Sequence, residues 1–319
     1  DRQGKGRREK DDEGHNRGFR HESASASINI LCVGMKSKRV YSWKCRDRVL
    51  AFQDRPLIMG ILNVTPDSFS DGGYFQDRNG AIAHGIRMLG EGADIIDIGG
   101  ESTRPGAAEV DAGEEIERVA PVIRELFRET GAVISVDTRK AAVAECALEA
   151  GACIINDVSA MTHDQGMKDV AAKYVAGVVL MHMLGSPGTM QNDPHYNNVV
   201  DEVSGYLRKR VDDLVAAGLR PETLAIDPGI GFGKTVGHNL SLIAGIDVFV
   251  NMGWPVVVGV SRKSFIGKIT GCPVDQRLAG SLAALTACVL KGAGVMRVHD
   301  VKESKEAAQI AAALAQQEK

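Results

Sequence analysis

The sequence predicts an α/β protein whose eight parallel strands close into a (β/α)8, or TIM, barrel in a single domain. Three observations support this prediction: short apolar runs alternate with longer amphipathic stretches, the alternation occurs eight times, and nearly every apolar run ends in a polar residue. Near-continuous apolar strands between helices are typical of a parallel sheet that is covered on both faces. Eight such units in about 260 residues match the size of a closed barrel.

The expected elements can be placed along the chain by this alternation. The strands are predicted at residues 57–64, 93–99, 132–138, 152–158, 176–182, 223–228, 255–261 and 294–300. The helices are predicted at residues 78–91, 113–130, 139–150, 164–174, 197–217, 238–252, 275–291 and 302–315. An open doubly wound sheet is the alternative fold. No spaced GxGxxG follows the first strand, which weakens a dinucleotide-binding version of that alternative.

The composition is that of an ordinary globular protein and argues against several function classes. The 319 residues are 44% hydrophobic, 25% charged and 5% aromatic, with a formal net charge of −3. No nucleic-acid partner is expected, because such a partner would need a clustered basic surface or stacking aromatic residues. No apolar run is long enough to span a membrane, and none of the six cysteines forms a CxxC pair. A cytoplasmic protein with reduced thiols is therefore predicted.

The first 50 residues differ from the rest and are predicted to be a disordered or non-native extension before a domain at residues 51–319. Residues 1–27 are dense in charges of both signs and almost free of large apolar side chains. They cannot bury enough surface to offset the entropy lost on ordering. The first methionine is Met35. Two explanations stay open: translation starts at Met35, or the segment is a disordered tail of unknown role.

The polar ends of the apolar runs predict the position of an active site. In a (β/α)8 barrel the C-terminal strand ends converge on one mouth, and active sites lie there. A single polar strand end is most often a helix cap or a turn residue, but a ring of them around one mouth is not explained in this way. The residues concerned are Asn63, Glu101 to Arg104, Asp137, Asn156, Asp157, His182, Asp227, Ser261 to Lys263, Arg297 and His299.

Three of these residues suit a flat heterocycle that is rich in N–H groups. Asp137 and Asp227 offer hydrogen-bond acceptors, and Asn156 offers both donors and acceptors. A pterin ring has an edge of this kind. For each residue alone, capping of the backbone is the alternative explanation.

A second group of residues suits an anion. Arg297 and His299 are two positions apart on one strand, so their side chains point the same way. Ser264 is expected to begin a short helix, and the free N–H groups of helix N-termini bind anions. Lys263 adds a full positive charge beside it. Phosphate sites in these barrels recur at the loops after strands seven and eight, where these residues lie.

Four longer motifs and a closing segment carry a family resemblance. They are NVTPDSFSDGG (63–73), GGESTRPGA (99–107), DPGIGFGK (227–234) and GVSRKSFIG (259–267), followed by RVHDV (297–301). In this order and at this spacing, from Pro56 to Ala313, the chain resembles the dihydropteroate synthases. The first two motifs are long loops that bear glycine and proline, as expected of lids over the mouth.

The resemblance implies a transferase of folate biosynthesis. Such an enzyme condenses 6-hydroxymethyl-7,8-dihydropterin diphosphate with p-aminobenzoate, and it releases 7,8-dihydropteroate and pyrophosphate. The resemblance also implies a homodimer, Mg²⁺ as cofactor and inhibition by sulfonamides. Two alternatives are a methyltetrahydrofolate–corrinoid methyltransferase-like barrel and a catalytically silent pterin-binding protein. The first would not need the anion site, and the second should lack a residue that the chemistry requires.

The resemblance also assigns roles to individual residues. The pterin would be bound by Asp137, Asn156, Asp227 and Lys263. The pyrophosphate would be bound by Asn63, Arg297 and His299, with Asn63 also at the metal ion. The p-aminobenzoate would be bound by Thr103, Pro105, Phe232 and Ser264, with Phe69 on the other loop. The residues implied in catalysis are Asp137, Lys263, Arg297 and His299. Asp97 and His182 also match family positions, and we expect Asp97 to support the mouth from inside and His182 to be either packed or functional.

Overall fold

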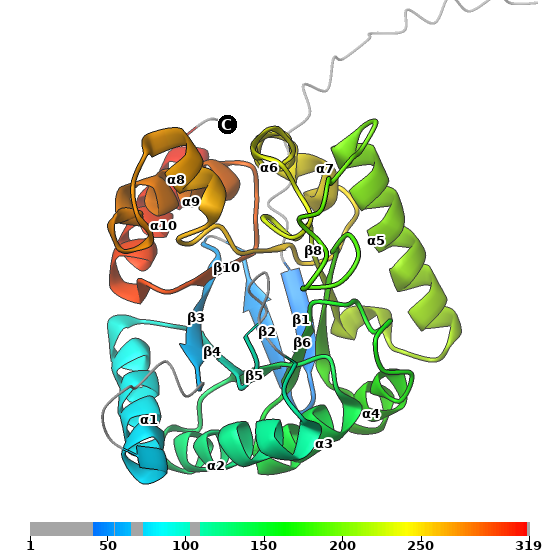
Figure 1. Ribbon diagram of the computed structural model, residues 1–319, viewed down its shortest axis with the longest axis vertical. Helices are drawn as coiled ribbons and strands as arrows, with labels where there is room; N and C mark the ends of the chain where they lie inside the picture. Colours follow the sequence, from blue (N-terminus) through cyan, green and yellow to red (C-terminus); the bar gives the residue numbers. More distant parts are fainter. Residues whose placement is uncertain (1–40, 54, 65–72, 103–108, 318–319) are drawn as a thin grey trace, which may run out of the picture. The chain divides into compact units, whose positions relative to one another are not determined.

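The structure is a computed structural model that describes residues 41–53, 55–64, 73–102 and 109–317. Eight parallel strands in the order β8-β7-β6-β5-β4-β3-β10-β9 form the main sheet (Figure 1). A parallel bridge between Ile226 on β8 and Val256, which precedes β9, joins the two ends of the sheet. The predicted barrel is thereby confirmed. Its strands are β3 (Leu57–Asn63), β4 (Ile95–Gly99), β5 (Ile134–Asp137), β6 (Ile154–Asp157), β7 (Gly177–Met181), β8 (Leu224–Asp227), β9 (Val257–Val258) and β10 (Val295–Val298).

The helices alternate with these strands and surround the barrel (Figure 1). Local sequence explains where several of them begin and end. The carboxylate of Asp111 accepts a hydrogen bond from the Gly113 N–H at the start of α2, and Gly131 ends that helix in a left-handed conformation. The helices are α1 (Gly73–Glu91), α2 (Ala112–Thr130), α3 (Ala141–Ala150), α4 (Met167–Tyr174), α5 (Val199–Ala216), α6 (Val236–Ala244), α7 (Ile246–Val250), α8 (Ser264–Thr270), α9 (Leu278–Leu290) and α10 (Val301–Ala315).

The helix predicted at residues 238–252 is in fact two helices, α6 and α7. The chain breaks between them at Gly245, whose φ of −100° and ψ of 17° are not helical. Glycine has a low helix propensity, which accounts for the break at this position. The short helix α8, in contrast, begins at Ser264 as the sequence predicts.

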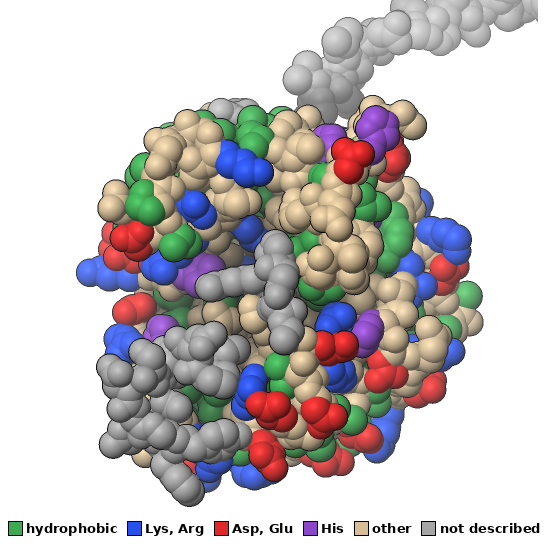
Figure 2. All heavy atoms as spheres, in the orientation of Figure 1, with side chains coloured by type: hydrophobic (Ala, Val, Ile, Leu, Met, Phe, Trp, Pro, Cys, Tyr) green, Lys and Arg blue, Asp and Glu red, His purple; other side chains and the backbone are tan. Residues whose placement is uncertain are grey.

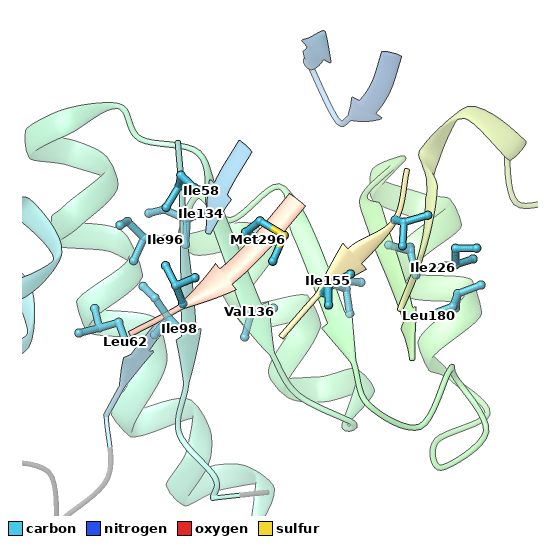
Figure 3. Close-up of a cluster of buried hydrophobic side chains, with 14 of the residues drawn as sticks. Ile58, Leu62, Ile96, Ile98, Ile134, Val136, Ile155, Leu180, Ile226 and Met296 are labelled. Carbon is cyan, nitrogen blue, oxygen red and sulfur yellow. The ribbon is translucent and has the colours of Figure 1, made fainter. Parts of the chain in front are cut away.

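The pleat of the strands separates an outer and an inner set of side chains. The outer set packs against helix residues such as Val119 and Ile123 and forms the larger core cluster. Figure 3 shows part of it, with residues from seven of the eight strands: Ile58, Leu62, Ile96, Ile98, Ile134, Val136, Ile155, Leu180, Ile226 and Met296. Residues one position away along the strands point to the inside of the barrel instead. This alternation places Asp97, Asp137, Asn156, Asp227 and Arg297 inside, at one end.

The other end of the barrel is filled by a two-stranded antiparallel hairpin, β1 (Tyr41–Cys45) and β2 (Arg48–Phe52). Trp43 is fully buried and donates a hydrogen bond from Nε1 to the Thr223 carbonyl oxygen at 2.8 Å. The hairpin packs against inward side chains near the beginnings of the strands, including Ile95, Ile154 and Val295. Residues 41–50 therefore belong to the ordered barrel domain. The boundary predicted at residue 51 is wrong, because an alternating pattern that buries Trp43 and Cys45 precedes it.

Residues 1–40 lie outside the described part of the chain. The expectation of a disordered extension there, and of a start at Met35, stays a prediction. In the part that the structure describes, no helix is both long enough and apolar enough to cross a membrane.

Candidate active site

The C-terminal parts of five strands bring polar side chains together at the mouth of the barrel. Asp97, Asp137, Asn156 and Asp227 are all at least nine-tenths buried. Arg297 reaches them from β10 and lies between two carboxylates. Its Nε donates to Asp97 Oδ2 at 2.6 Å, and its Nη2 donates to Asp137 Oδ2 at 2.7 Å. These side chains form one connected cluster rather than separate strand-end caps.

Asp97 lies at the bottom of this cluster, the floor of the site, and links two of its members. Its Oδ2 also accepts a hydrogen bond from Asn156 Nδ2 at 3.1 Å, while the carboxylate itself is fully buried. The contacts agree with the expectation that Asp97 supports the mouth from inside. Burial opposes the charge on Arg297, but Asp97 and Asp137 together raise its pKa above the usual value.

A cleft opens above this floor. Phe232 and Lys263, the residue before α8, both line it. The Lys263 Nζ lies 4.2 Å from the centroid of the Phe232 ring, within cation–π range. The lining consists of Asp137, Asn156, Val158, Met181, Asp227, Gly229, Ile230, Phe232, Gly259, Lys263 and Arg297. The structure therefore brings the whole predicted pterin set, Phe232 and Arg297 into one cavity.

The electrostatics of the cleft depend on two buried carboxyls and one buried amine. Burial raises the pKa of Asp137, an effect that Arg297 opposes. Burial also raises the pKa of Asp227, although the Gly229 N–H, 2.7 Å from Asp227 Oδ1, opposes this rise. Burial and the charge of Arg297 lower the pKa of Lys263. The protonation states of these three groups therefore depend on one another.

His299 lies beside the cleft but does not line it. Its backbone N–H donates to Ser261 Oγ at 3.2 Å, and its Nδ1 lies 3.0 Å from the same oxygen. The hydroxyl can donate to Nδ1, which leaves the proton of a neutral ring on Nε2. Burial, with Arg297 nearby, lowers the pKa of His299 to about 3. The ring is therefore a neutral donor at pH 7.

The remaining predicted residues are less closely grouped. Asn63 ends β3 with an exposed side chain, and Ser264 is an exposed residue at the start of α8. Neither lines the cleft. Phe69, Thr103 and Pro105 lie outside the described residues, so the predicted loop side of the p-aminobenzoate site stays a prediction. His182 is 7% exposed and contacts Lys234, which favours the packed role considered for it.

An ionic network near the mouth was not predicted. Glu101, which follows β4, accepts hydrogen bonds from Arg139 at 3.2 Å and from Lys140 at 2.8 Å. Lys140 also binds the fully buried Glu115 at 2.6 Å. Burial opposes the ionisation of Glu101, but Lys140 and Arg139 lower its pKa. The partners are far apart in sequence, so no local pattern points to this network.

Lys234 is a second residue that the sequence did not single out. It ends the motif DPGIGFGK, but a lysine before a helix is normally exposed, and here only 3% of it is accessible.

In Figure 2, positive and negative side chains are interspersed over the described part of the face in view. The buried charges at the mouth are thus distinct from an ordinary mixed surface.

Comparisons with known proteins show which family this chain resembles in sequence and in structure. A family model for the pterin binding enzymes matches residues 59–299. The dihydropteroate synthase of Haemophilus influenzae is 47% identical over 251 residues, which are 79% of this chain and 91% of that protein. Two solved structures are similar as well. The Xanthomonas albilineans dihydropteroate synthase with 4-aminobenzoic acid has a TM-score of 0.81 and 45% identity, covering 86% of this chain and 98% of the other. The Yersinia pestis dihydropteroate synthase with a sulfonamide drug has a TM-score of 0.81 and 44% identity, covering 86% and 99%.

A (β/α)8 barrel with two carboxyls, an amide, a lysine and an arginine in one mouth is an enzyme of the kind that binds a flat polar heterocycle at its strand ends. The chain belongs to the pterin-binding enzyme family and, within it, to the dihydropteroate synthases, which are transferases of folate biosynthesis.

Proposed function

We propose that the mouth of this dihydropteroate synthase holds the pterin with Asp137, Asn156, Asp227 and Lys263, and that it joins the pterin's methylene carbon to the amine of p-aminobenzoate. The observation that carries this assignment is the single cleft that these four residues line together with Arg297. Asp137 and Asp227 supply acceptors to ring N–H groups, and Asn156 supplies both kinds of partner.

The diphosphate is assigned to Arg297, His299 and Asn63. A guanidinium has five N–H donors, and Arg297 uses two of them on Asp97 and Asp137. The others can donate to a phosphate oxygen. Its double attachment also links the pterin side of the cleft to the diphosphate side, so Arg297 serves both and not the diphosphate alone. The Nε2–H of neutral His299 is a further donor.

Mg²⁺ is proposed as the cofactor, and the donors present fit it. Within the described residues, no group of three or more His, Cys, Asp or Glu side chains could hold a metal ion. The side-chain oxygen of Asn63 is a hard donor of the kind that Mg²⁺ accepts, alongside substrate phosphates and water. When bound, Mg²⁺ would neutralise charge on the departing pyrophosphate.

In this reaction the main contribution of the protein is to place charged and hydrogen-bonding groups around the reacting atoms. The C–O bond to the diphosphate breaks, and the pair of electrons leaves with pyrophosphate. Arg297 and His299 stabilise this growing negative charge. The remaining dihydropterin carries positive charge at its exocyclic methylene. The negative charge of the Asp137 carboxylate stabilises this positive charge. The aniline nitrogen then attacks as a neutral amine and loses a proton, so no strong general base is required.

The p-aminobenzoate slot is assigned to Phe232, Ser264, Thr103 and Pro105. The relative from Xanthomonas albilineans was solved with 4-aminobenzoic acid, and the one from Yersinia pestis with a sulfonamide drug. We propose that sulfonamides compete with p-aminobenzoate in this chain as well. The inhibitor should raise the apparent KM for p-aminobenzoate and leave kcat unchanged. A noncompetitive pattern would contradict the assigned slot.

The decisive experiment is a pyrophosphate-release assay with both substrates. We expect release only when the dihydropterin diphosphate, p-aminobenzoate and Mg²⁺ are all present, and we expect Asp137→Asn to abolish most of it. A folded protein that binds the pterin but releases no pyrophosphate would favour the silent pterin-binding alternative. Methyl transfer from a methylated folate would favour the corrinoid methyltransferase alternative. The homodimer and the cytoplasmic location stay predictions.

A further inference from the structure

The loop that carries Phe232 is hydrogen-bonded by side chains from several other segments of the chain. We call residues 229–233, between β8 and α6, the wall loop. Three consecutive carbonyl oxygens of this loop each accept a hydrogen bond from a different side chain. The donors are Gln191 Nε2 to Gly231 at 2.7 Å, Lys234 Nζ to Phe232 at 2.8 Å, and Tyr196 Oη to Gly233 at 3.0 Å.

Two backbone N–H groups of the wall loop also donate to side chains. Gly229 donates to Asp227 Oδ1 and Gly231 donates to Asn239 Oδ1, both at 2.7 Å. Gly229, Gly231 and Gly233 have left-handed φ values of 68°, 87° and 65°. A Cβ on Gly229 would lie 1.9 Å from the His182 carbonyl oxygen. The wall loop is therefore pressed against the segment that follows β7, and its path tolerates few alternatives.

Lys234 connects these two segments. Its Nζ lies 3.0 Å from His182 Nδ1, 3.3 Å from the His182 carbonyl oxygen and 2.8 Å from the Phe232 carbonyl oxygen. An ammonium has three donors, and these three neutral acceptors match them. Burial lowers the pKa of Lys234 to about 7, although Asp227 opposes the shift. A charge buried this deeply destabilises the fold unless it is well solvated by dipoles, so its place behind the cleft calls for a functional explanation.

That explanation lies in what the wall loop presents to the cleft. The Phe232 ring lies under Lys263 Nζ, at 4.2 Å from its centroid. The Phe232 carbonyl is held by Lys234 from behind, and the carbonyls on either side are held by Gln191 and Tyr196. A shift of this backbone would move the ring away from Lys263.

We propose that Lys234, Tyr196 and Gln191 are positioning residues that hold Phe232 in place as the aromatic wall of the p-aminobenzoate slot. The inference rests on the proposed function, because that function assigns the slot to Phe232. None of the three side chains lines the cleft. They act through the backbone of the wall loop, so their loss should affect the second substrate more than the pterin, because three of the four pterin partners, Asp137, Asn156 and Asp227, lie on strand ends.

The test compares Lys234→Met, Tyr196→Phe and Gln191→Ala in the full chain. Each should raise the KM for p-aminobenzoate, and Lys234→Met should do so by about tenfold, because a hydrogen bond from a charged donor is the strongest of the three. kcat should stay within about twofold, and the affinity for a dihydropterin without the diphosphate should stay within about threefold. A merely structural role would instead reduce the fraction of folded enzyme, which lowers apparent kcat and leaves KM unchanged.

Two matched controls separate the hydrogen bonds from the substitutions themselves. Tyr206→Phe removes a hydroxyl from a ring that also packs on His182, at 5.0 Å between centroids, but that hydroxyl is not among the donors to the wall loop in the described structure. Lys302→Met removes an exposed lysine on α10. Both should leave the KM for p-aminobenzoate unchanged.

The affinity for p-aminobenzoate, measured by calorimetry with pyrophosphate and Mg²⁺ present, provides a readout that does not depend on turnover. Weaker binding in the three variants supports the positioning role even if the wild-type enzyme releases no pyrophosphate, a result that would refute the proposed reaction alone. If Lys234→Met does not fold, Tyr196→Phe and Gln191→Ala decide. Unchanged KM and affinity in the folded variants, or an equal loss of pterin affinity, would overturn the proposal.

Discussion

At the scale of single residues, the most consequential contacts run from Arg297 to Asp97 and Asp137. Each carboxylate lies on a different strand, and the guanidinium compensates the charge of both. Removing one partner of a buried ion pair leaves an uncompensated charge, which costs far more than an exposed pair contributes. The two bonds therefore fix Arg297 in the folded protein, and its remaining N–H groups are the ones proposed to bind the diphosphate.

Arg297→Met should lower turnover by a factor of about 10²–10³ and the free energy of unfolding by about 3–5 kcal/mol. Pterin affinity should fall as well, because burial raises the pKa of Asp137 and without Arg297 nothing of equal strength would oppose that rise. Adding Asp97→Asn should recover part of the unfolding free energy, since it removes one of the two unpaired charges. Urea unfolding and pyrophosphate release measure these effects. Strict additivity of the two substitutions would show that the residues are not coupled.

A second residue-scale prediction concerns pH. Burial raises the pKa of Asp227 to about 6, from the ordinary aspartate value of about 3.9. Between these two values the folded state binds more protons than the unfolded state, so the free energy of unfolding falls as pH rises through this window. Asp227→Asn removes this contribution, and its amide oxygen can still accept from Gly229. The variant should gain stability over the wild type progressively from about pH 4 and reach about 3 kcal/mol above about pH 6.

The matched control is Asp212→Asn, on the exposed face of α5. Its unfolding free energy should follow that of the wild type at every pH. Parallel curves for wild type and Asp227→Asn would mean that Asp227 is ionised without penalty in the folded state. The expected gain in stability should accompany a loss of turnover, because the same carboxyl is assigned to the pterin.

At the scale of elements, the hairpin β1–β2 closes the end of the barrel opposite the cleft. Trp43 is fully buried there and its indole N–H has a partner on the carbonyl of Thr223. Trp43→Ala should lower the free energy of unfolding by about 3–5 kcal/mol, because it leaves a large cavity among the inward side chains. KM values for both substrates should not change, since the cleft is at the other end. An exposed substitution on the same hairpin, Val49→Ala, serves as control in urea unfolding.

The elements also show what the sequence could and could not predict. Strand runs such as residues 177–181 and the start of α8 at Ser264 were predictable, because apolar runs and N-terminal motifs are local signals. The break at Gly245 and the hairpin were missed. A single glycine only lowers helix propensity, and a five-residue strand such as β1 shows its alternation over too few positions to stand out.

In the candidate site, too, some features could be predicted from the sequence and others could not. Strand-end residues such as Asp137 and Asp227 were found because the pleat and the barrel bring strand ends together whatever the intervening sequence. The partners of Arg297 and the burial of Lys234 could not be found in this way. Both depend on which side chains meet across the barrel or across two loops, and contacts between residues as far apart as Arg297 and Asp97 leave no periodic signal.

At the scale of the whole molecule, the barrel separates stability from chemistry along its axis. The end opposite the cleft holds apolar side chains and the hairpin, whereas the mouth holds charges that are costly to bury. Such a barrel can tolerate a charged mouth because the packed remainder supplies the stability. The position of the hairpin implies that the folding unit must include residues before 51, although the sequence suggested a domain that begins there.

This leads to a prediction about truncation. A chain of residues 35–319 keeps the hairpin intact, so it should match the full chain in thermal midpoint and turnover. A chain of residues 51–319 lacks β1 and the first part of β2 and exposes inward side chains such as Ile95 and Ile154. Losing this buried apolar surface should lower the thermal midpoint by at least about 10 °C, while any enzyme that remains folded should keep its KM for p-aminobenzoate. Thermal unfolding of the three chains under one condition measures the effect. A large loss in the 35–319 chain would show that the first 34 residues contribute to the fold, and an unaltered midpoint in the 51–319 chain would show that the barrel closes without its hairpin.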